Sequence, residues 1–352
     1  MEKAMSDIKR IHLIGGTASP YTRKMLALLR YRHIPYKITW GQPELVLPEM
    51  GIENPKPVLL PVFVFTDEQG NDTAVCDSTP IIRRLEGMQE GRSVLPQDPA
   101  IAFIDYLLED FGDEWCTKYM FHYRWHFEVD AENAGTLLPL SNKADLSPEE
   151  HAKFKAYFSK RQIDRLYVVG SNDTTAPIID ASYRRLLGAF ERHFEAQRYF
   201  LGGRPGAGDF AIYGQLTQLV GYDPTPRAIA HEVSPRTVAW VDCTEDLSGL
   251  PDDETSWNDP DYMPATLKPI LEEVGNMYVP TLLANAKALQ AGEKSWQIEL
   301  DGARWTQQTF PYQAKCLRWI NEQYSALADN DRRRVDAILA GTGCEAVILS
   351  QN

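Results

Sequence analysis

The order of predicted elements in residues 9–88 constrains the fold more than any other feature of this sequence. The apolar run "IHLI" is typical of a buried strand, and "SPYTRKMLALL", which follows two glycines, has the apolar spacing of a helix. "YKITW" predicts a second strand, "PVFVF" and "TAVC" predict a hairpin around "DEQGND", and "DSTPIIRRLEGM" predicts a helix. The order is βαβ followed by ββα, which predicts an α+β domain.

The rest of the chain carries mostly helical patterns, and strand signals nearly vanish after residue 99. A separate all-helical domain is therefore expected behind the first domain. Its helices are expected at residues 100–126, 148–167, 179–197 and 207–220. The expected units of the chain are a first domain at 9–88, a linker at 89–99, the helical domain at 100–240 and an extension at 241–352.

Residues 237–267 carry eight acidic residues and no basic one, together with several Pro and Gly. This composition predicts a long surface excursion that could serve as a lid. Beyond it we expect further helix, a hairpin about Asp301-Gly302, and a mostly helical segment from Tyr312 to Leu339.

The composition disfavours several classes of protein. The formal net charge of −13 argues against binding to nucleic acid, which depends on basic side chains. The sequence has no run of about 18 apolar residues and no apolar N-terminal signal, so we expect a cytoplasmic protein that does not span a membrane. The five cysteines include no CxxC pair, which argues against a disulfide framework or a zinc ribbon.

The stretch "GTASPYTRKM" predicts the start of a helix at Ser19-Pro20. Serine caps free backbone N–H groups, and proline suits the first helical position. A hydroxyl at a helix N-terminus also lies where the helix dipole favours negative charge, including that of a thiolate. Ser19 can therefore be a cap, a thiolate-stabilising group, or both.

Two further motifs in the first domain each allow an ordinary structural explanation and a functional one. Pro61 in "VLLPVF" could open an edge strand, or it could be a cis-proline that turns the backbone of Leu60 outward to pair with an extended peptide. Asp77-Ser78 in "CDSTPII" could simply cap a helix. As a site, the pair offers a carboxylate for an amino group and a helix N-terminus for a carboxylate.

In this order and spacing, the three motifs resemble the glutathione S-transferase family. The resemblance implies a thioredoxin-like N-terminal domain and an all-helical C-terminal domain over residues 9–240, followed by an extension that the resemblance does not cover. "YFLGGRPGAGDFAIYGQL" resembles the start of the family's buried sixth helix, in which a capping Ser or Thr precedes an Asp by three residues. Here Asp209 is present, but Gly206 occupies the cap position.

The resemblance implies that the ligand and co-substrate is glutathione. Asp77 and Ser78 would hold its γ-glutamyl end, and the backbone of Leu60, before Pro61, would pair with its cysteinyl part. The thiol would lie beside the first helix, near Thr17 and Ser19.

The thiolate-stabilising group is expected to be a hydroxyl. The tyrosine-dependent classes of the family carry a phenol at the end of the first strand, where this chain has Ile14 and Gly15. Cysteine-dependent classes have a thiol directly before the proline, where this chain has Ser19, so reduction of mixed disulfides is disfavoured. Ser19 and Thr17 are competing candidates, with Tyr21 a distant third.

The segment "FGDEWCTKYMFHYRWHF" predicts an aromatic stripe on one helical face. Such a stripe is usually core. The resemblance implies instead that Trp115, Tyr119 and His122 could line a pocket for an apolar electrophile. His122 and His126 have the i,i+4 spacing of metal ligands, but without an HExxH pattern or a third ligand we expect no metal.

The function expected from this resemblance is that of a homodimeric transferase that adds the glutathione thiolate to a small hydrophobic electrophile. The alternative is a noncatalytic protein of the same fold that serves in binding or assembly. The glycine at position 206, the unassigned thiolate donor and the long extension leave room for this alternative.

Overall fold

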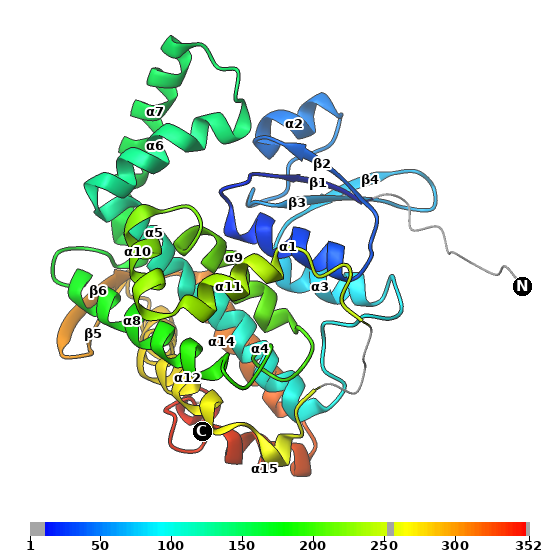
Figure 1. The fold of residues 1–352 in the computed structure, drawn as a ribbon, viewed down its shortest axis with the longest axis vertical. Helices are drawn as coiled ribbons and strands as arrows, with labels where there is room; N and C mark the ends of the chain where they lie inside the picture. Colours follow the sequence, from blue (N-terminus) through cyan, green and yellow to red (C-terminus); the bar gives the residue numbers. More distant parts are fainter. Residues whose placement is uncertain (1–10, 252–256, 350–352) are drawn as a thin grey trace, which may run out of the picture.

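The computed structural model describes residues 11–251 and 257–349 (Figure 1). A four-stranded mixed sheet lies in the first domain, with the strand order β2-β1-β3-β4. β1 is parallel to β2 and antiparallel to β3, and β3 is antiparallel to β4. The strands are β1 (Ile11–Gly15), β2 (Tyr36–Trp40), β3 (Val62–Thr66) and β4 (Asp72–Val75).

Helices cover both faces of this sheet. α1 (Pro20–Tyr31) and α3 (Ser78–Glu86) lie together on one face, and α2 (Pro43–Glu49) lies on the other (Figure 1). Successive side chains of β3 point to opposite faces of the sheet. Phe63 packs in the main core, and Val62 packs with Leu47 of α2 on the other face. The Pro- and Glu-rich segment between β2 and β3 thus contains a short helix, α2.

The helical domain follows an irregular stretch between α3 and residue 99. The single helix expected at 100–126 is divided at Trp115, and the helix at 128–142 was not expected. A short 3₁₀ turn, η1 (Leu166–Val169), precedes α8. The helices are α4 (Pro99–Glu114), α5 (Cys116–His126), α6 (Glu128–Asn142), α7 (Pro148–Ile163), α8 (Ala176–His193), α9 (Ala207–Leu219), α10 (Pro224–Val233) and α11 (Pro235–Thr244).

The N-terminus of α9 explains why glycine replaces the expected capping residue. The Gly206 N–H donates to Asp209 Oδ2 at 2.9 Å, and the Gly208 N–H donates to Asp105 Oδ1 of α4 at 3.0 Å. A Cβ atom at Gly206 would lie 2.2 Å from that same Asp105 oxygen. Asp105 therefore supplies, from another helix, the acceptor that a capping serine would provide, and it occupies the space that the serine would need.

We expect Gly206→Ser to lower the free energy of unfolding by about 1–3 kcal/mol, because its Cβ overlaps the Asp105 carboxylate. Asp105→Ala alone should cost about 1 kcal/mol through loss of the cap. In the double variant the serine has both the space and a free N–H to accept from, so its stability should exceed that of Gly206→Ser. Urea unfolding of the three variants checks this, and simple additivity of the two losses would contradict it.

The extension returns along the helical domain. It contains the short turns η2 (Pro260–Tyr262) and η3 (Ala265–Leu267), and the hairpin expected about Asp301-Gly302 is confirmed. Both turn residues have positive φ, 50° and 81°, which a tight two-residue hairpin favours. The remaining elements are α12 (Lys268–Glu273), a π-helical turn (Val274–Tyr278), α13 (Val279–Gln290), β5 (Ser295–Leu300), β6 (Ala303–Gln308), α14 (Pro311–Ser325), α15 (Asp329–Leu339) and α16 (Glu345–Leu349). α14 packs against α4 (Figure 1).

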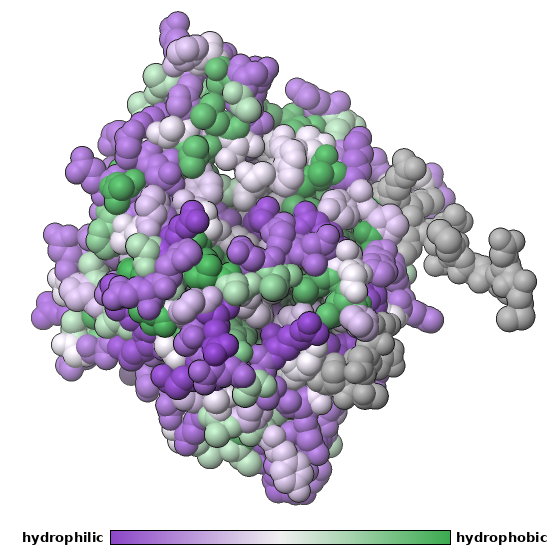
Figure 2. Space-filling model, viewed as in Figure 1, coloured by the Kyte–Doolittle hydropathy of each residue, from purple (hydrophilic) through white to green (hydrophobic). Residues whose placement is uncertain are grey.

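The acidic segment 237–267 is only partly the excursion that its composition predicts. It begins inside α11, and residues 252–256 lie outside the described residues. Glu245 forms ion pairs with Arg23 and Arg30 of α1, which fasten the segment to the side of the first domain. In the described part of the chain, no helix is long and apolar enough to cross a membrane. Hydrophilic residues cover most of the visible face, with hydrophobic ones in small separate groups (Figure 2).

Candidate functional site

The three sequence motifs meet at one end of the sheet. Ile14 of β1 pairs with Val62 of β3, and Phe63 pairs with Val75 of β4. The residues after β1, before β3 and after β4 are therefore neighbours at the same end of the sheet. This register brings together the segments that contain Ser19, Pro61 and Asp77, as the sequence motifs require for a common ligand.

Ser19 is the N-cap of α1, and its hydroxyl oxygen accepts the Thr22 N–H at 3.2 Å. Capping uses an acceptor site of the oxygen, so the hydroxyl hydrogen of the half-buried side chain stays available to a ligand. α9 fixes this end of α1, since a Cβ at Gly214 would lie 2.5 Å from the Pro20 carbonyl oxygen. The ordinary and the functional explanations of Ser19 are thus compatible.

Of the competing hydroxyls, Thr17 is half-buried in the turn between β1 and α1. The Tyr21 hydroxyl hydrogen is not available to a ligand thiolate, because the OH donates to the Asp113 carbonyl oxygen at 2.7 Å. Burial, together with Glu114 and Asp113, raises the pKa of Tyr21 well above its usual value. This leaves Ser19 and Thr17 as the candidates.

The peptide bond between Leu60 and Pro61 is cis. β3 lies inside the sheet, between β1 and β4, so the edge-strand explanation of Pro61 is wrong. None of the backbone hydrogen bonds outside helices and strands in the described residues involves Leu60, whose backbone remains able to pair with a ligand. A Cβ atom at Gly16 would lie 3.9 Å from Asn142 Oδ1 at the end of α6, a neighbour that sequence reasoning missed.

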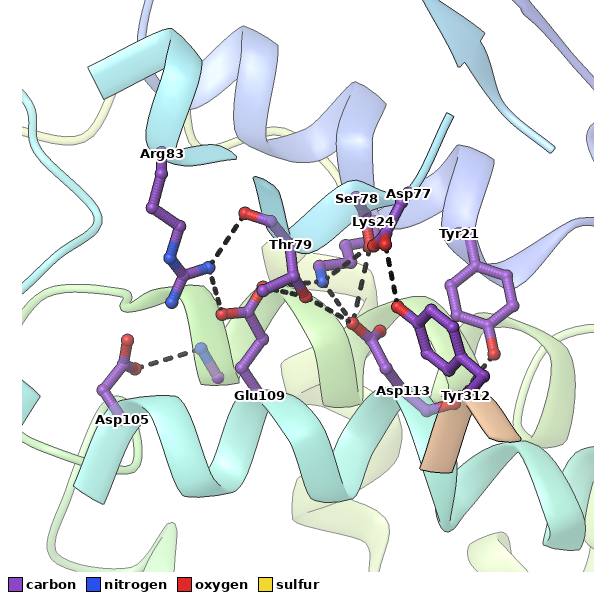
Figure 3. A network of polar contacts seen from close by, with 11 residues as sticks. Tyr21, Lys24, Asp77, Ser78, Thr79, Arg83, Asp105, Glu109, Asp113 and Tyr312 are labelled. Atoms are coloured by element: carbon purple, nitrogen blue, oxygen red, sulfur yellow. Dashed lines mark hydrogen bonds and ion pairs between the residues drawn. The ribbon is translucent and has the colours of Figure 1, made fainter. Parts of the chain in front are cut away.

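Asp77 has a backbone conformation that a non-glycine residue rarely adopts, with φ 85° and ψ 103°. Although it is the N-cap of α3, its side chain makes no capping hydrogen bond. The Tyr312 OH of α14 donates to Asp77 Oδ2 at 2.9 Å (Figure 3). Lys315 Nζ lies 3.9 Å from the same oxygen. Sequence reasoning missed both partners, because they lie in the extension that the family resemblance does not cover.

Ser78 is buried, with 8% of its surface exposed, and it joins a charged network behind the site (Figure 3). Its hydroxyl accepts from Lys24 Nζ at 3.0 Å and donates to Asp113 Oδ2 at 3.4 Å. Lys24 Nζ also contacts Asp113 Oδ2 at 2.6 Å and Glu109 Oε1 at 3.0 Å, and Arg83 pairs with Glu109. The hydroxyl that the resemblance assigns to a ligand is therefore engaged within the protein.

The charges of this network balance. Burial opposes the charge of Lys24, but Asp113 and Glu109 outweigh burial and raise the pKa of Lys24. Burial likewise opposes ionisation of Glu109, yet Arg83 and Lys24 lower its pKa to about 2. Burial raises the pKa of Asp113 to about 6 against the opposing effect of Lys24. At neutral pH two cations thus face two carboxylates.

Glu114, the next carboxyl along α4, forms no ion pair with the described residues, and Lys118 lowers its pKa less than burial raises it. Burial, the largest cause, and the nearby charges of Asp110 and Asp113 raise the pKa of Glu114 to about 8. The folded protein therefore binds this proton more tightly than an unfolded glutamate does. The stabilising contribution is present below about pH 4.5 and is lost as the pH rises towards about 8.

We therefore expect the free energy of unfolding to decline across this pH range, and Glu114→Gln to flatten the decline. Urea unfolding at several pH values measures both slopes. Equal slopes for the two proteins would contradict the assignment to Glu114.

The aromatic stripe belongs to the core, which corrects the expectation of a substrate pocket there. Trp115, Tyr119 and His122 are at most 1% exposed. The Trp115 Nε1–H donates to the Tyr119 OH at 2.7 Å, and the Trp115 ring packs against Trp305 of the extension. Burial lowers the pKa of His122 to about 3, and the ring hydrogen-bonds to Ser171. Among the described residues, no group of three or more His, Cys, Asp or Glu is placed to hold a metal ion.

Comparisons with known proteins agree with this architecture. The family model "Glutathione S-transferase, N-terminal domain" matches residues 13–93, and "Glutathione S-transferase, C-terminal domain" matches residues 164–243. Comparison with curated proteins gives no match.

Three solved structures illustrate the similarity. A Tau class glutathione S-transferase from mango, Mangifera indica, is 18% identical over 74% of this chain and 96% of that one, with a TM-score of 0.39. A glutathione transferase from Burkholderia graminis, with two glutathione molecules bound per subunit, is 16% identical over 69% and 96%, with a TM-score of 0.42. FzlA from C. crescentus is 18% identical over 74% and 92%, with a TM-score of 0.39.

The N-terminal match spans the candidate ligand residues from Thr17 to Ser78, and residues 244–352 lie beyond both matches. The sheet domain lies within the first match, and the helical domain that contains the second match follows it along the chain. The chain therefore belongs to the glutathione S-transferase family.

Proposed function

We propose that this protein binds glutathione at the end of the sheet and adds its thiolate to a small hydrophobic electrophile. The observation that carries the proposal is the strained Asp77, which stands beside the cis Leu60–Pro61 bond and the capped end of α1. Carboxyl-bearing residues held in sparsely populated conformations cluster at ligand sites. Asp77 would accept from the γ-glutamyl ammonium, Leu60 would pair with the cysteinyl backbone, and the sulfur would lie near Ser19 and Thr17.

A hydroxyl at a helix N-terminus is sufficient for the chemistry. A thiol with a pKa near 8.5 is only about 3% ionised at pH 7, and lowering that pKa by about two units raises the fraction to roughly three quarters. The shift needs about 2.7 kcal/mol of selective stabilisation, which one charge-assisted hydrogen bond and a helix dipole can supply. The thiolate then attacks the electrophilic carbon and a thioether forms. An aryl halide loses halide, an epoxide opens at its C–O bond to an alkoxide, and an enone gives an enolate, the last two taking a proton from water.

The test combines binding and turnover. Calorimetry with glutathione should show binding, and aryl halides, epoxides and enones should be consumed faster with the protein than without it. Absence of binding at millimolar glutathione would refute the proposal. A homodimeric state and a cytoplasmic location belong to the same proposal, and light scattering tests the first of them.

A second candidate is a noncatalytic member of the family, and the burial of the expected substrate-pocket residues favours it. Trp115, Tyr119 and His122 lie in the core and not in a pocket for an electrophile. Binding of glutathione without turnover of any electrophile would support this candidate over the enzyme.

A further inference from the structure

We propose that the C-terminal extension completes the γ-glutamyl subsite, with Lys315 binding the α-carboxylate of the ligand and Tyr312 positioning Asp77 for the α-ammonium. This inference rests on the proposed function. It follows from α14, which brings the Tyr312 OH to 2.9 Å and Lys315 Nζ to 3.9 Å from Asp77 Oδ2.

The hydrogen bonds of Asp77 leave part of its carboxylate available. Tyr312 donates to Oδ2, whereas Oδ1 makes no hydrogen bond with the described residues, and the side chain is 17% exposed. Burial and the charge of Asp77 raise the pKa of Tyr312, which keeps the phenol a neutral donor. Tyr312 therefore fixes one oxygen of Asp77 and leaves the other to accept from an ammonium group.

The cation of the first domain that lies behind Ser78, Lys24, is already paired with carboxylates of α4. The Ser78 hydroxyl faces Asp113 at 3.4 Å, and Lys24 behind it is shared by Asp113 and Glu109. A second carboxylate placed there would meet two negative charges at close range.

Lys315, unlike Lys24, is not held between two close carboxylates. Its side chain is 39% exposed, and its only ion-pair partner among the described residues is Asp77, at the long distance of 3.9 Å. Its ammonium lies over the Trp319 ring, 4.0 Å from the ring centroid, and 5.2 Å from that of Tyr312. The aromatic rings hold the cation beside Asp77 without neutralising it.

The subsite therefore presents one negative and one positive group side by side, which suits a zwitterionic amino acid head group. Glutathione carries such a head, with an α-ammonium and an α-carboxylate on its γ-glutamyl residue. Two analogues separate the contributions. Glutaryl-Cys-Gly lacks the ammonium, and 4-aminobutanoyl-Cys-Gly lacks the carboxylate.

Calorimetry with the full-length protein and these three peptides tests the assignment. Lys315→Ala should weaken glutathione binding at least tenfold and leave binding of 4-aminobutanoyl-Cys-Gly unchanged. Tyr312→Phe should weaken the binding of glutathione and 4-aminobutanoyl-Cys-Gly, which carry the ammonium, and leave the binding of glutaryl-Cys-Gly unchanged. Arg318→Ala is the matched control, because Arg318 lies on the same helix but pairs with Glu322, and it should bind all three peptides as the unmodified protein does.

The outcomes are distinguishable. If the unmodified protein binds no glutathione, the proposed function fails and this inference fails with it. If glutathione binds and Lys315→Ala binds it equally well or more tightly, only the inference is overturned, since Lys315 then contributes nothing or competes with the ligand. Lys315→Arg keeps the positive charge and should retain most of the affinity, and circular dichroism confirms that each variant is folded.

Discussion

Replacing Lys24 with methionine is expected to lower the free energy of unfolding by about 3–5 kcal/mol, because two buried carboxylates lose their cation. Lys24 is fully buried, and its ammonium joins α1 to α3 through Ser78 and to α4 through Glu109 and Asp113. Methionine fills a similar volume, so the loss comes from charge rather than from a cavity. Removal of the Lys24 ammonium affects Asp113 more than Glu109, because Glu109 keeps its ion pair with Arg83.

Urea unfolding at neutral pH measures this loss. Adding Asp113→Asn to Lys24→Met removes one of the unpaired charges and should recover a large part of the stability. The surface variant Lys160→Met is the control, because Lys160 is 78% exposed in its pair with Asp164 and should lose at most about 1 kcal/mol. A Lys24→Met protein as stable as this control would show that the network does not hold the domains together.

Ser19→Asp is expected to reduce glutathione-dependent activity on the order of 20–100-fold with little loss of stability. Aspartate caps a helix as well as serine does, so α1 keeps its N-cap. An ionised carboxylate has no proton to donate to the glutathione thiolate, and its charge repels the thiolate. Ser19→Ala should lose both the activity and about 1 kcal/mol of stability, because it removes the cap as well.

The pH dependence of kcat/KM and the ultraviolet absorbance of the bound thiolate report the thiol pKa directly. In Ser19→Asp the apparent pKa should rise by about two units. Thr17→Val separates the two candidate donors, because valine keeps the shape of threonine without its hydroxyl. If Thr17→Val raises the thiol pKa and Ser19→Asp does not, Thr17 is the donor and the assignment to Ser19 is wrong.

Local signals in the sequence were sufficient for much of the first domain and for the hairpin of the extension. Ser19-Pro20 marks the start of α1, and Asp301-Gly302 marks a tight hairpin, because each depends on conformational preferences of adjacent residues. The same holds for the strands, whose apolar runs are short and well bounded. Motifs of this kind place Ser19, Pro61 and Asp77 at one end of the sheet once the strand register is known.

Features that depend on distant residues could not be predicted. The cap of α9 comes from Asp105, about a hundred positions earlier, and no pattern around Gly206 reveals it. The aromatic stripe has the same spacing whether it lines a pocket or packs in the core, and the burial of Trp115 beneath Trp305 decides the question. The partners of Asp77 lie in a part of the chain that the family resemblance does not cover.

The hydrogen bond between Tyr312 and Asp77 joins residues 235 positions apart, and this separation has a consequence for biosynthesis. N-terminal domains leave the ribosome and fold first, so the sheet and α1 can assemble while α14 is still being translated. A nascent chain, or a protein that ends before α14, would then have Asp77 without Tyr312 and Lys315 beside it. Assembly of these contacts around Asp77 is thereby tied to completion of translation.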